Sequence, residues 1–191
     1  MKMETDQQNT DFKTLEKDLE TQELEAANGI PSTEVYGRLL CCYLLHNDLC
    51  NAKFLWKRIP QSVKTATPEL SNIWAVGQKI WQREFPGIYE TLQKEWTDPY
   101  KDLLAAVLEA TRKRAFNLVA NAYSYIGVDD FSVIVGLPVN DAVKAAQDRG
   151  WTADQNSRLV MPSKPVPDTD PLLPSEQQLS VLTDYVSFLE S

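Results

Sequence analysis

The sequence contains few of the residues that build catalytic centres. It has one histidine, His46, three cysteines and seven glycines among 191 residues. A catalytic zinc site needs several histidine, cysteine or acidic ligands around an open position, and the chain has no HxH or HExxH motif. The glycines are isolated and form no phosphate-binding loop. We therefore expect no catalytic residue, no metal, no cofactor and no small-molecule ligand, and we interpret His46 as a capping or surface residue at a helix end.

The three cysteines lie close together, at Cys41, Cys42 and Cys50, and they form no CxxC pair. An odd number without a disulfide pattern is typical of a reducing, intracellular compartment. We interpret these cysteines as small hydrophobic residues in or near a helical core. A thiol enzyme using Cys41 and His46 is disfavoured, because five helical positions separate the two side chains by well over a quarter turn.

The sequence also has no excess of basic residues and no long apolar run. The chain has 27 acidic and 19 basic residues, for a formal net charge of −8. Residues 1–30 carry −5, residues 31–127 carry +3 and residues 128–191 carry −6. A nucleic-acid binder needs basic groups to neutralise phosphates, so this balance disfavours one. No apolar stretch reaches 18 residues and the chain is polar as far as Phe12, which predicts neither a membrane span nor a signal peptide.

The strongest local pattern is a helical hairpin. Ser32 or Thr33 is expected to cap a helix that ends near His46, and the Asn47–Asp48 turn is expected to start a second helix that stops before Pro60. Large residues on the first helix face a small residue on the second with the spacing of a tetratricopeptide repeat. An ordinary hairpin with an aromatic core explains the same pattern, and no second repeat aligns with it. The expected core residues are Tyr36, Leu39, Tyr43, Ala52 and Trp56.

Other helices are expected on both sides of this hairpin. An acidic helix over residues 11–27, which either docks weakly or is partly mobile, precedes it. A helix that begins at Pro68 follows and is interrupted at residues 85–87. Shorter helices then start near Ile88 and at Asp98, where Pro99 suits a first turn.

From Arg112 the pattern becomes helix, strand, helix, helix, strand, strand, which is the element order of a winged helix. The helix runs to about Tyr123, a short strand covers residues 124–126, and a helix capped by Asp129 or Asp130 covers residues 131–135. A second helix lies between Pro138 and Gly150, and strands are expected at residues 151–153 and 158–161 with a turn between them. The basic cluster at residues 112–114 is interpreted as a solvated face or a salt-bridge site for a partner.

The C-terminal part combines a linker with an amphipathic helix. Five prolines between residues 162 and 174 predict an extended linker, and residues 175–191 predict a helix with a broad apolar face. An isolated helix of this length is marginal in water, and burial of each large side chain contributes roughly 1.5–3 kcal/mol. This face is therefore expected to be buried, either on its own domain or against helices of a partner. The residues expected to bind the partner are Leu179, Leu182, Tyr185, Val186 and Leu189.

A winged helix often binds DNA through the second helix of its helix-turn-helix. Here that helix, residues 139–149, has two acidic and two basic residues, and Asp129 and Asp130 precede it. We therefore expect no nucleic-acid partner, and a winged-helix nucleic-acid binder is kept as the alternative of a different class.

Several short sequences along the chain are specific in combination. They are YLLHND at 43–48, LWKRIP at 55–60, GQKIWQR at 77–83, FPGIY at 85–89, VGLPV at 135–139 and LTDYV at 182–186. On these residues, the chain from about Leu19 to Ser191 resembles the small PCI-domain subunits of the constitutive photomorphogenesis 9 (COP) signalosome. Small PCI-type subunits of the proteasome lid and of translation initiation factor three are the alternatives within the same class.

The resemblance implies a mainly α fold with PCI architecture. Its parts would be an acidic N-terminal helix or tail at 1–30, a helical-repeat region with tetratricopeptide-like hairpins at 31–111 and a winged-helix subdomain at 112–161. A proline-rich linker at 162–174 and a C-terminal bundle helix at 175–191 would follow.

The resemblance also implies a non-catalytic scaffold subunit in the cytoplasm and nucleus. The whole complex would remove a ubiquitin-like modifier from cullins (protein deneddylation) and so regulate cullin–RING ubiquitin ligases, with the metalloprotease site on another subunit. Subunit 3 would be the neighbour, the tail helix would join a bundle of helices from the remaining subunits, and no membrane would be involved. Winged helices of this family pair edge to edge, and the residues expected at that edge are Trp151, Thr152, Ala153, Arg158, Leu159 and Val160.

Overall fold

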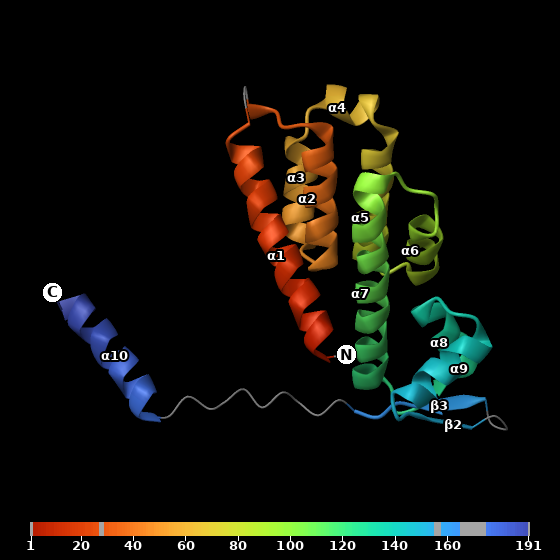
Figure 1. Cartoon of the computed structure of the whole chain (residues 1–191). Helices are drawn as coiled ribbons and strands as arrows, with labels where there is room; N and C mark the ends of the chain where they lie inside the picture. The colour runs from red at the N-terminus through yellow and green to blue at the C-terminus, as the bar shows by residue number, and fades with distance from the viewer. Residues whose placement is uncertain (1, 27–28, 155–157, 165–174, 191) are drawn as a thin grey trace.

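A computed structural model describes residues 2–26, 29–154, 158–164 and 175–190. It is mainly helical, with one small antiparallel sheet (Figure 1). The helices are α1 (Lys2–Leu24), α2 (Thr33–Leu45), α3 (Leu49–Arg58), α4 (Gln61–Ala66), α5 (Pro68–Gln82), α6 (Phe85–Leu92), α7 (Asp98–Ala122), α8 (Val128–Val135), α9 (Val139–Asp148) and α10 (Ser175–Glu190). The strands are β1 (Ile126–Gly127), β2 (Thr152–Asp154) and β3 (Leu159–Met161).

The helical hairpin α2–α3 has the predicted boundaries, and both of its caps come from side chains. Ser32 Oγ accepts a hydrogen bond from the backbone N–H of Val35 at 3.4 Å, and the Asp48 carboxylate accepts one from the N–H of Asn51 at 3.0 Å. Between them Asn47 takes the left-handed conformation, with φ 61°. The hairpin therefore begins and turns where residues with the required side-chain oxygens occur.

The segment after the hairpin differs from the expectation at two points. The short helix α4 follows Pro60 directly and was not predicted. The expected interruption exists but lies before residues 85–87: α5 ends at Gln82, Arg83 takes the left-handed conformation with φ 57°, and Phe85, Pro86 and Gly87 form the first turn of α6. Proline suits that position, since the first N–H groups of a helix have no partner inside the helix.

Helix α7 is the longest helix among the described residues and joins two hydrophobic cores. Two separate helices meeting near Arg112 were expected, and this is wrong: the helix continues without a break from Asp98 to Ala122. Leu104 and Val107, in its first half, pack in a core with α2, α3 and α5. Phe116 and Val119, in its second half, pack in a second core with the sheet, α8 and α9. The apolar pattern changed near Arg112 because the packing partners change there.

The second core has the element order expected from the sequence. Strand β3 lies between β1 and β2, and both pairings are antiparallel, with Ile126 opposite Val160 and Ala153 opposite Val160. Helix α8 starts at Val128 instead of after Asp130, which places the two aspartates in its first turn, where the helix dipole favours them.

Tyr89 on α6 connects the two cores. Its hydroxyl donates a hydrogen bond to the carbonyl of Ile134 at 2.9 Å. Its ring lies against Gly136, which ends α8 with φ +67°. A Cβ at Gly136 would lie 2.2 Å from the Tyr89 ring, so this close approach requires glycine.

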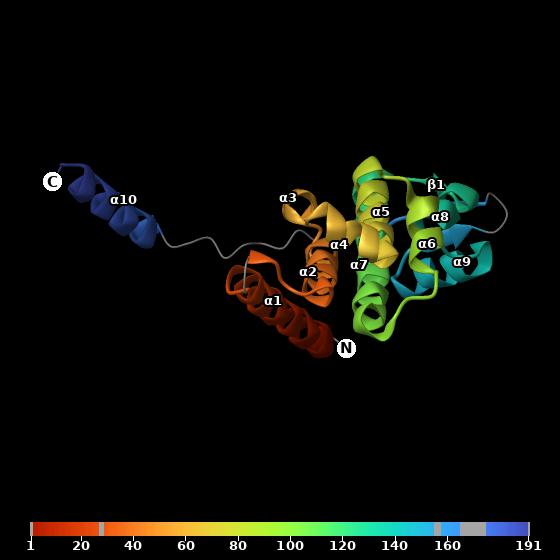
Figure 2. The same cartoon turned by 90° about the horizontal axis from the view of Figure 1, so that it is seen from above.

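Helix α10 lies apart from the other helices in both views (Figures 1 and 2). Its range agrees with the helix predicted at 175–191. Residues 165–174 of the expected linker and residues 155–157 of the expected turn lie outside the described residues.

Candidate interaction surfaces

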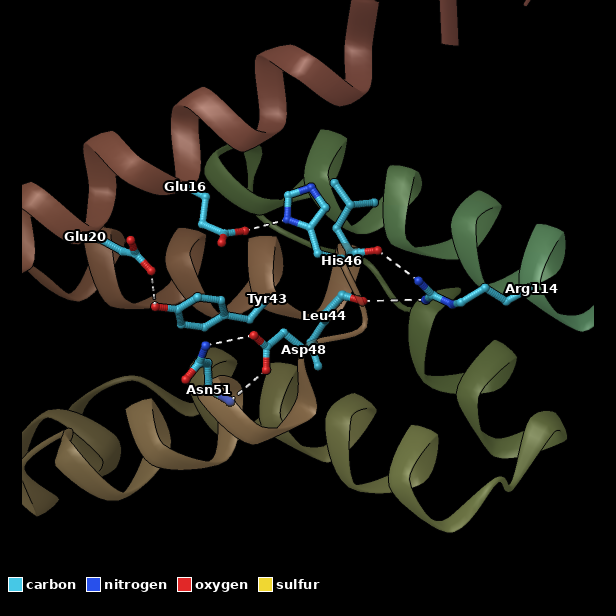
Figure 3. Close-up of polar contacts among 9 residues, drawn as sticks. Glu16, Glu20, Tyr43, Leu44, His46, Asp48, Asn51 and Arg114 are labelled. Carbon is cyan, nitrogen blue, oxygen red and sulfur yellow. Dashed lines mark hydrogen bonds and ion pairs between the residues drawn. The ribbon is translucent and has the colours of Figure 1, made fainter. Parts of the chain in front are cut away.

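His46 and the cysteines form no catalytic arrangement in the part of the chain that the structure describes. His46 occupies the C-cap of α2, and its Nδ1 pairs with the carboxylate of Glu16 on α1 (Figure 3). This agrees with its interpretation as a residue at a helix end. Among the described residues, no group of histidine, cysteine and acidic side chains could hold a metal ion.

The thiols differ in their exposure. Cys41 and Cys42 are fully buried, as expected of small core residues, and burial raises the pKa of both thiols, that of Cys42 to about 12. Both are therefore protonated at neutral pH and poor nucleophiles. The expectation of a core position is wrong for Cys50, which is exposed on the first turn of α3.

Three acidic residues of α1 attach this helix to the hairpin, and Figure 3 shows two of them, Glu16 and Glu20. Glu16 pairs with His46, Glu20 accepts a hydrogen bond from the hydroxyl of Tyr43 at 2.8 Å, and Glu23 pairs with Arg58 of α3 at 2.8 Å. Leu19 lies between these carboxylates along α1 and is only 2% exposed. Part of the negative charge of the N-terminal segment therefore pairs with residues from the middle of the chain within the fold.

The basic cluster at residues 112–114 is only partly a solvated face. Lys113 is exposed, but Arg114 points inward and donates hydrogen bonds to the carbonyls of Leu45 at 2.8 Å and Leu44 at 3.5 Å (Figure 3). Arg112 pairs with Glu109 at 2.9 Å. The expected solvated role is thus wrong for Arg114, which links α7 to the end of α2.

The expected residues of the hairpin core lie together between α2 and its neighbours. Tyr36, Leu39, Tyr43 and Ala52 are 0–4% exposed. Trp56 is half-buried, and its ring stacks on that of Trp74 of α5, with 5.7 Å between the ring centroids. Trp56 therefore joins the hairpin to α5 at the edge of the core.

The tail residues lie together on α10 and are exposed. Leu179, Leu182, Tyr185, Val186 and Leu189 are 51–79% exposed. Side chains of this size on one helix bury their apolar surface only against another body. None of the described helices is both long and apolar enough to cross a membrane.

The residues expected at the edge of the winged helix lie at different places in the sheet, and only some of them are on an outer strand. Thr152 and Ala153 lie on β2, an outer strand of the sheet. Leu159 and Val160 lie on β3, which pairs with strands on both sides, so its backbone cannot offer an open edge. Arg158 precedes β3 and pairs with Asp129 at 2.9 Å.

The side chain of Trp151 is also internal. It is 8% exposed, and its ring contacts those of Phe116 and Phe131, with centroids 5.5 Å and 5.6 Å away. The predicted edge is therefore wrong for Trp151 and for the strand at 158–161, and it stays a prediction for Thr152 and Ala153.

A groove between α3 and α5 was not identified from the sequence. It has a volume of about 220 Å³ and is lined by Leu49, Lys53, Trp74, Gly77, Gln78, Trp81 and Gln82. The signal in the sequence was the placement of two tryptophans seven residues apart with glycine between them, which puts all three on one face of a helix.

Comparisons with known proteins agree over most of the chain. Residues 31–169 match the model of the CSN8/PSMD8/EIF3K family. The COP9 signalosome complex subunit 8 of Danio rerio is 54% identical over 173 residues, covering 90% of this chain and 91% of the relative. The protein of the same name from Xenopus laevis is 52% identical, covering 97% and 95%, and that from Arabidopsis thaliana is 35% identical, covering 81% and 79%.

Proposed function

The chain belongs to the CSN8/PSMD8/EIF3K family, and on that basis we propose that it is a non-catalytic scaffold subunit of a COP9 signalosome. The similarity to signalosome subunits named as such extends over at least nine tenths of both chains in the fish and frog relatives. This supports the signalosome over the proteasome lid and translation initiation factor three, whose subunits are the alternatives within the family.

The scaffold role is supported most directly by α10. Five large apolar side chains on this helix are at least 51% exposed, and burying each would contribute roughly 1.5–3 kcal/mol. We propose that α10 joins a helical bundle formed with other subunits and that Leu182 and Leu189 lie in it. A position away from the other helices suits a segment that is buried only on assembly.

The region around the sheet supports a second contact. We propose that α7, β1, α8, α9, β2 and β3 form a winged helix, and that the hairpin α2–α3 belongs to a tetratricopeptide-like region. The outer strand β2 would then pair with the edge of a neighbouring sheet, for which subunit 3 is our candidate. Thr152 and Ala153 would contribute the backbone groups.

In this role the chain would contribute by holding other subunits of the complex together and not by catalysis. The deneddylation of cullins, and with it the regulation of cullin–RING ligases, would take place on another subunit, a metalloprotease. We propose a location in cytoplasm and nucleus, which imaging of a fluorescently labelled chain would check.

A co-purification experiment tests the tail. The full chain and its Leu182→Asp variant would be expressed with an affinity tag in cells, and captured subunits would be quantified by mass spectrometry. We expect the variant to lose at least roughly 80% of the captured signalosome subunits, because a charge in an apolar contact costs several kcal/mol unless it is paired.

Ser187→Asp adds the same charge to an exposed polar position of the same helix and is the control. Capture of all subunits at full stoichiometry by the Leu182→Asp variant would refute the bundle role of the tail. Capture of lid or initiation-factor subunits by the unmodified chain would instead refute the assignment to the signalosome.

A further inference from the structure

The groove between α3 and α5 takes no part in the contacts proposed above, and its walls combine two large aromatic rings with a lysine. Trp74 and Trp81 come from α5, while Leu49 and Lys53 come from α3. Trp81 is 59% exposed, which is unusual for a tryptophan in a helical domain. Lys53 holds its ammonium over the Trp81 ring, with 5.6 Å to the centroid, so charge and aromatic surface are presented together.

The size of the groove limits the occupant. A volume of about 220 Å³ is enough for one large aliphatic or aromatic side chain and is below the usual range for small-molecule pockets, about 300–1,000 Å³. The rim residues Gln78 and Gln82 offer amide donors and acceptors to a backbone that passes over the groove. These features fit an extended or helical peptide that inserts one apolar anchor.

The charge of the surroundings limits the occupant further. Residues 49–82 contain five basic residues and one acidic residue, in a chain whose net charge is −8. One of the five, Arg58, pairs with Glu23 of α1, which leaves four basic residues in this segment for a partner. The acidic residue, Glu69, accepts hydrogen bonds from Thr97, and Asp48 beside the groove caps α3 through Asn51. None of the groove-lining residues is acidic.

We propose that this groove binds an acidic peptide segment of a partner protein, with one large apolar side chain inserted between Trp74 and Trp81 and a carboxylate beside Lys53. The groove contains a single lysine, whereas single-stranded nucleic acid is bound along a groove lined by several cations. Helix α10 of the same chain lies away from α3 and α5, the helices that line the groove (Figures 1 and 2). The proposal is independent of the tail and of the sheet edge.

Nuclear magnetic resonance of the full chain tests the proposal, because each tryptophan gives its own indole N–H signal. The probe is a short synthetic peptide of aspartate and glutamate with one central phenylalanine. We expect the signals of Trp74 and Trp81 to shift on titration, and those of Trp96 and Trp151 to stay. The Trp96 indole N–H donates a hydrogen bond to the carbonyl of Leu92, and Trp151 lies in the second core. Unchanged signals from these two residues would therefore also show that the fold is intact.

Three variants separate the contributions of the Trp81 ring and of the Lys53 charge to peptide binding. Trp81→Ala removes an exposed ring and is expected to weaken peptide binding roughly tenfold or more. Lys53→Glu is expected to weaken it roughly fivefold, and less at high salt. Lys144→Glu makes the same charge change on α9, at an exposed position in the other half of the fold, and is expected to leave the affinity unchanged within about twofold.

Other results would overturn the proposal. Equal binding of a peptide with asparagine and glutamine in place of the acids would show that charge plays no part. Stronger shifts with an oligothymidylate would assign the groove to nucleic acid. Movement of the Trp74 and Trp81 signals when the chain is truncated after Lys164 would show that the tail fills the groove. Absence of any shift at millimolar peptide would show that the groove binds no such segment.

Discussion

Replacement of Arg114 by methionine should destabilise the protein more than any other change within the basic cluster of α7. The guanidinium donates hydrogen bonds to the carbonyls of Leu45 at 2.8 Å and Leu44 at 3.5 Å, and to the hydroxyl of Thr111 at 3.1 Å. The carbonyls in the last turn of a helix have no partner within it. Backbone N–H groups after α2 satisfy Leu44, and Arg114 provides the hydrogen bond to Leu45.

The expected loss can be estimated from these contacts. A hydrogen bond to a charged group contributes about 1.5–3 kcal/mol, and leaving a buried carbonyl without a donor adds to the cost. Methionine keeps most of the apolar stem, and the desolvation of the guanidinium, which lowers the pKa of Arg114, disappears with the charge. We therefore expect the free energy of unfolding to fall by about 2–3 kcal/mol.

Urea unfolding followed by far-ultraviolet circular dichroism measures this loss. With a slope of about 2–3 kcal/mol per molar urea, the midpoint should fall by about 1 M. Lys113→Met, at the neighbouring exposed position, is the control and should change the free energy of unfolding by less than about 0.5 kcal/mol. A loss below about 0.5 kcal/mol for Arg114→Met would show that the hydrogen bonds to the end of α2 do not stabilise the junction of α2 and α7.

Further outcomes follow from the glycine, thiol and phenol positions. Gly136→Ala should lower the free energy of unfolding by about 1–2 kcal/mol for its positive φ and by a further 1–3 kcal/mol for the clash with Tyr89. Gly150→Ala, with φ +78° and open space around it, is the control and should lose only the roughly 1–2 kcal/mol for the positive φ. Equal losses for the two variants in urea unfolding would contradict the close approach of Tyr89 to Gly136. Ellman's reagent should react with one thiol of the native chain, that of Cys50, and with three after unfolding, and reaction of a second native thiol would contradict the burial of the other two. Burial raises the pKa of Tyr89 from 10.0 to about 12. The folded state therefore holds this proton more tightly, and the associated stability is present below pH 10 and is lost as the pH rises to about 12. Urea midpoints at increasing pH should show a shallower decline for Tyr89→Phe than for the unmodified chain, and identical slopes would refute this cause.

Local chemistry explains why the hairpin could be predicted from the sequence. Ser32 and Asp48 supply cap oxygens, and Asn47 tolerates a left-handed turn, so the ends of α2 and α3 depend on residues within three positions of each end. The positive φ of Gly136 ends α8 in the same local way. The tail helix was predicted from apolar periodicity alone, and its exposed face is the part of the candidate site that the sequence indicated in advance.

Errors arose where a pattern has several physical causes. The apolar pattern changes near Arg112 because α7 passes from one core to the other, and a change of this kind is also typical of the end of a helix. Cys50 is close to Cys41 and Cys42 in the sequence, but it lies on a different helix and faces solvent. The groove at Trp81 was missed because a tryptophan on a helix face indicates burial unless the packing partner is known.

The sequence by itself determined the helical class of this protein, the caps and turns of its hairpin, the order of the elements around the sheet, and its lack of the histidine ligands that a zinc site requires. Each of these depends on residue types or on spacings of a few positions. Only the tertiary structure decided that Arg114 points inward, that Trp151 lies in a core and that β3 is the central strand. These features depend on which elements pack together across long separations in the chain, and such pairings are set by the total burial and hydrogen bonding of the fold rather than by any local pattern.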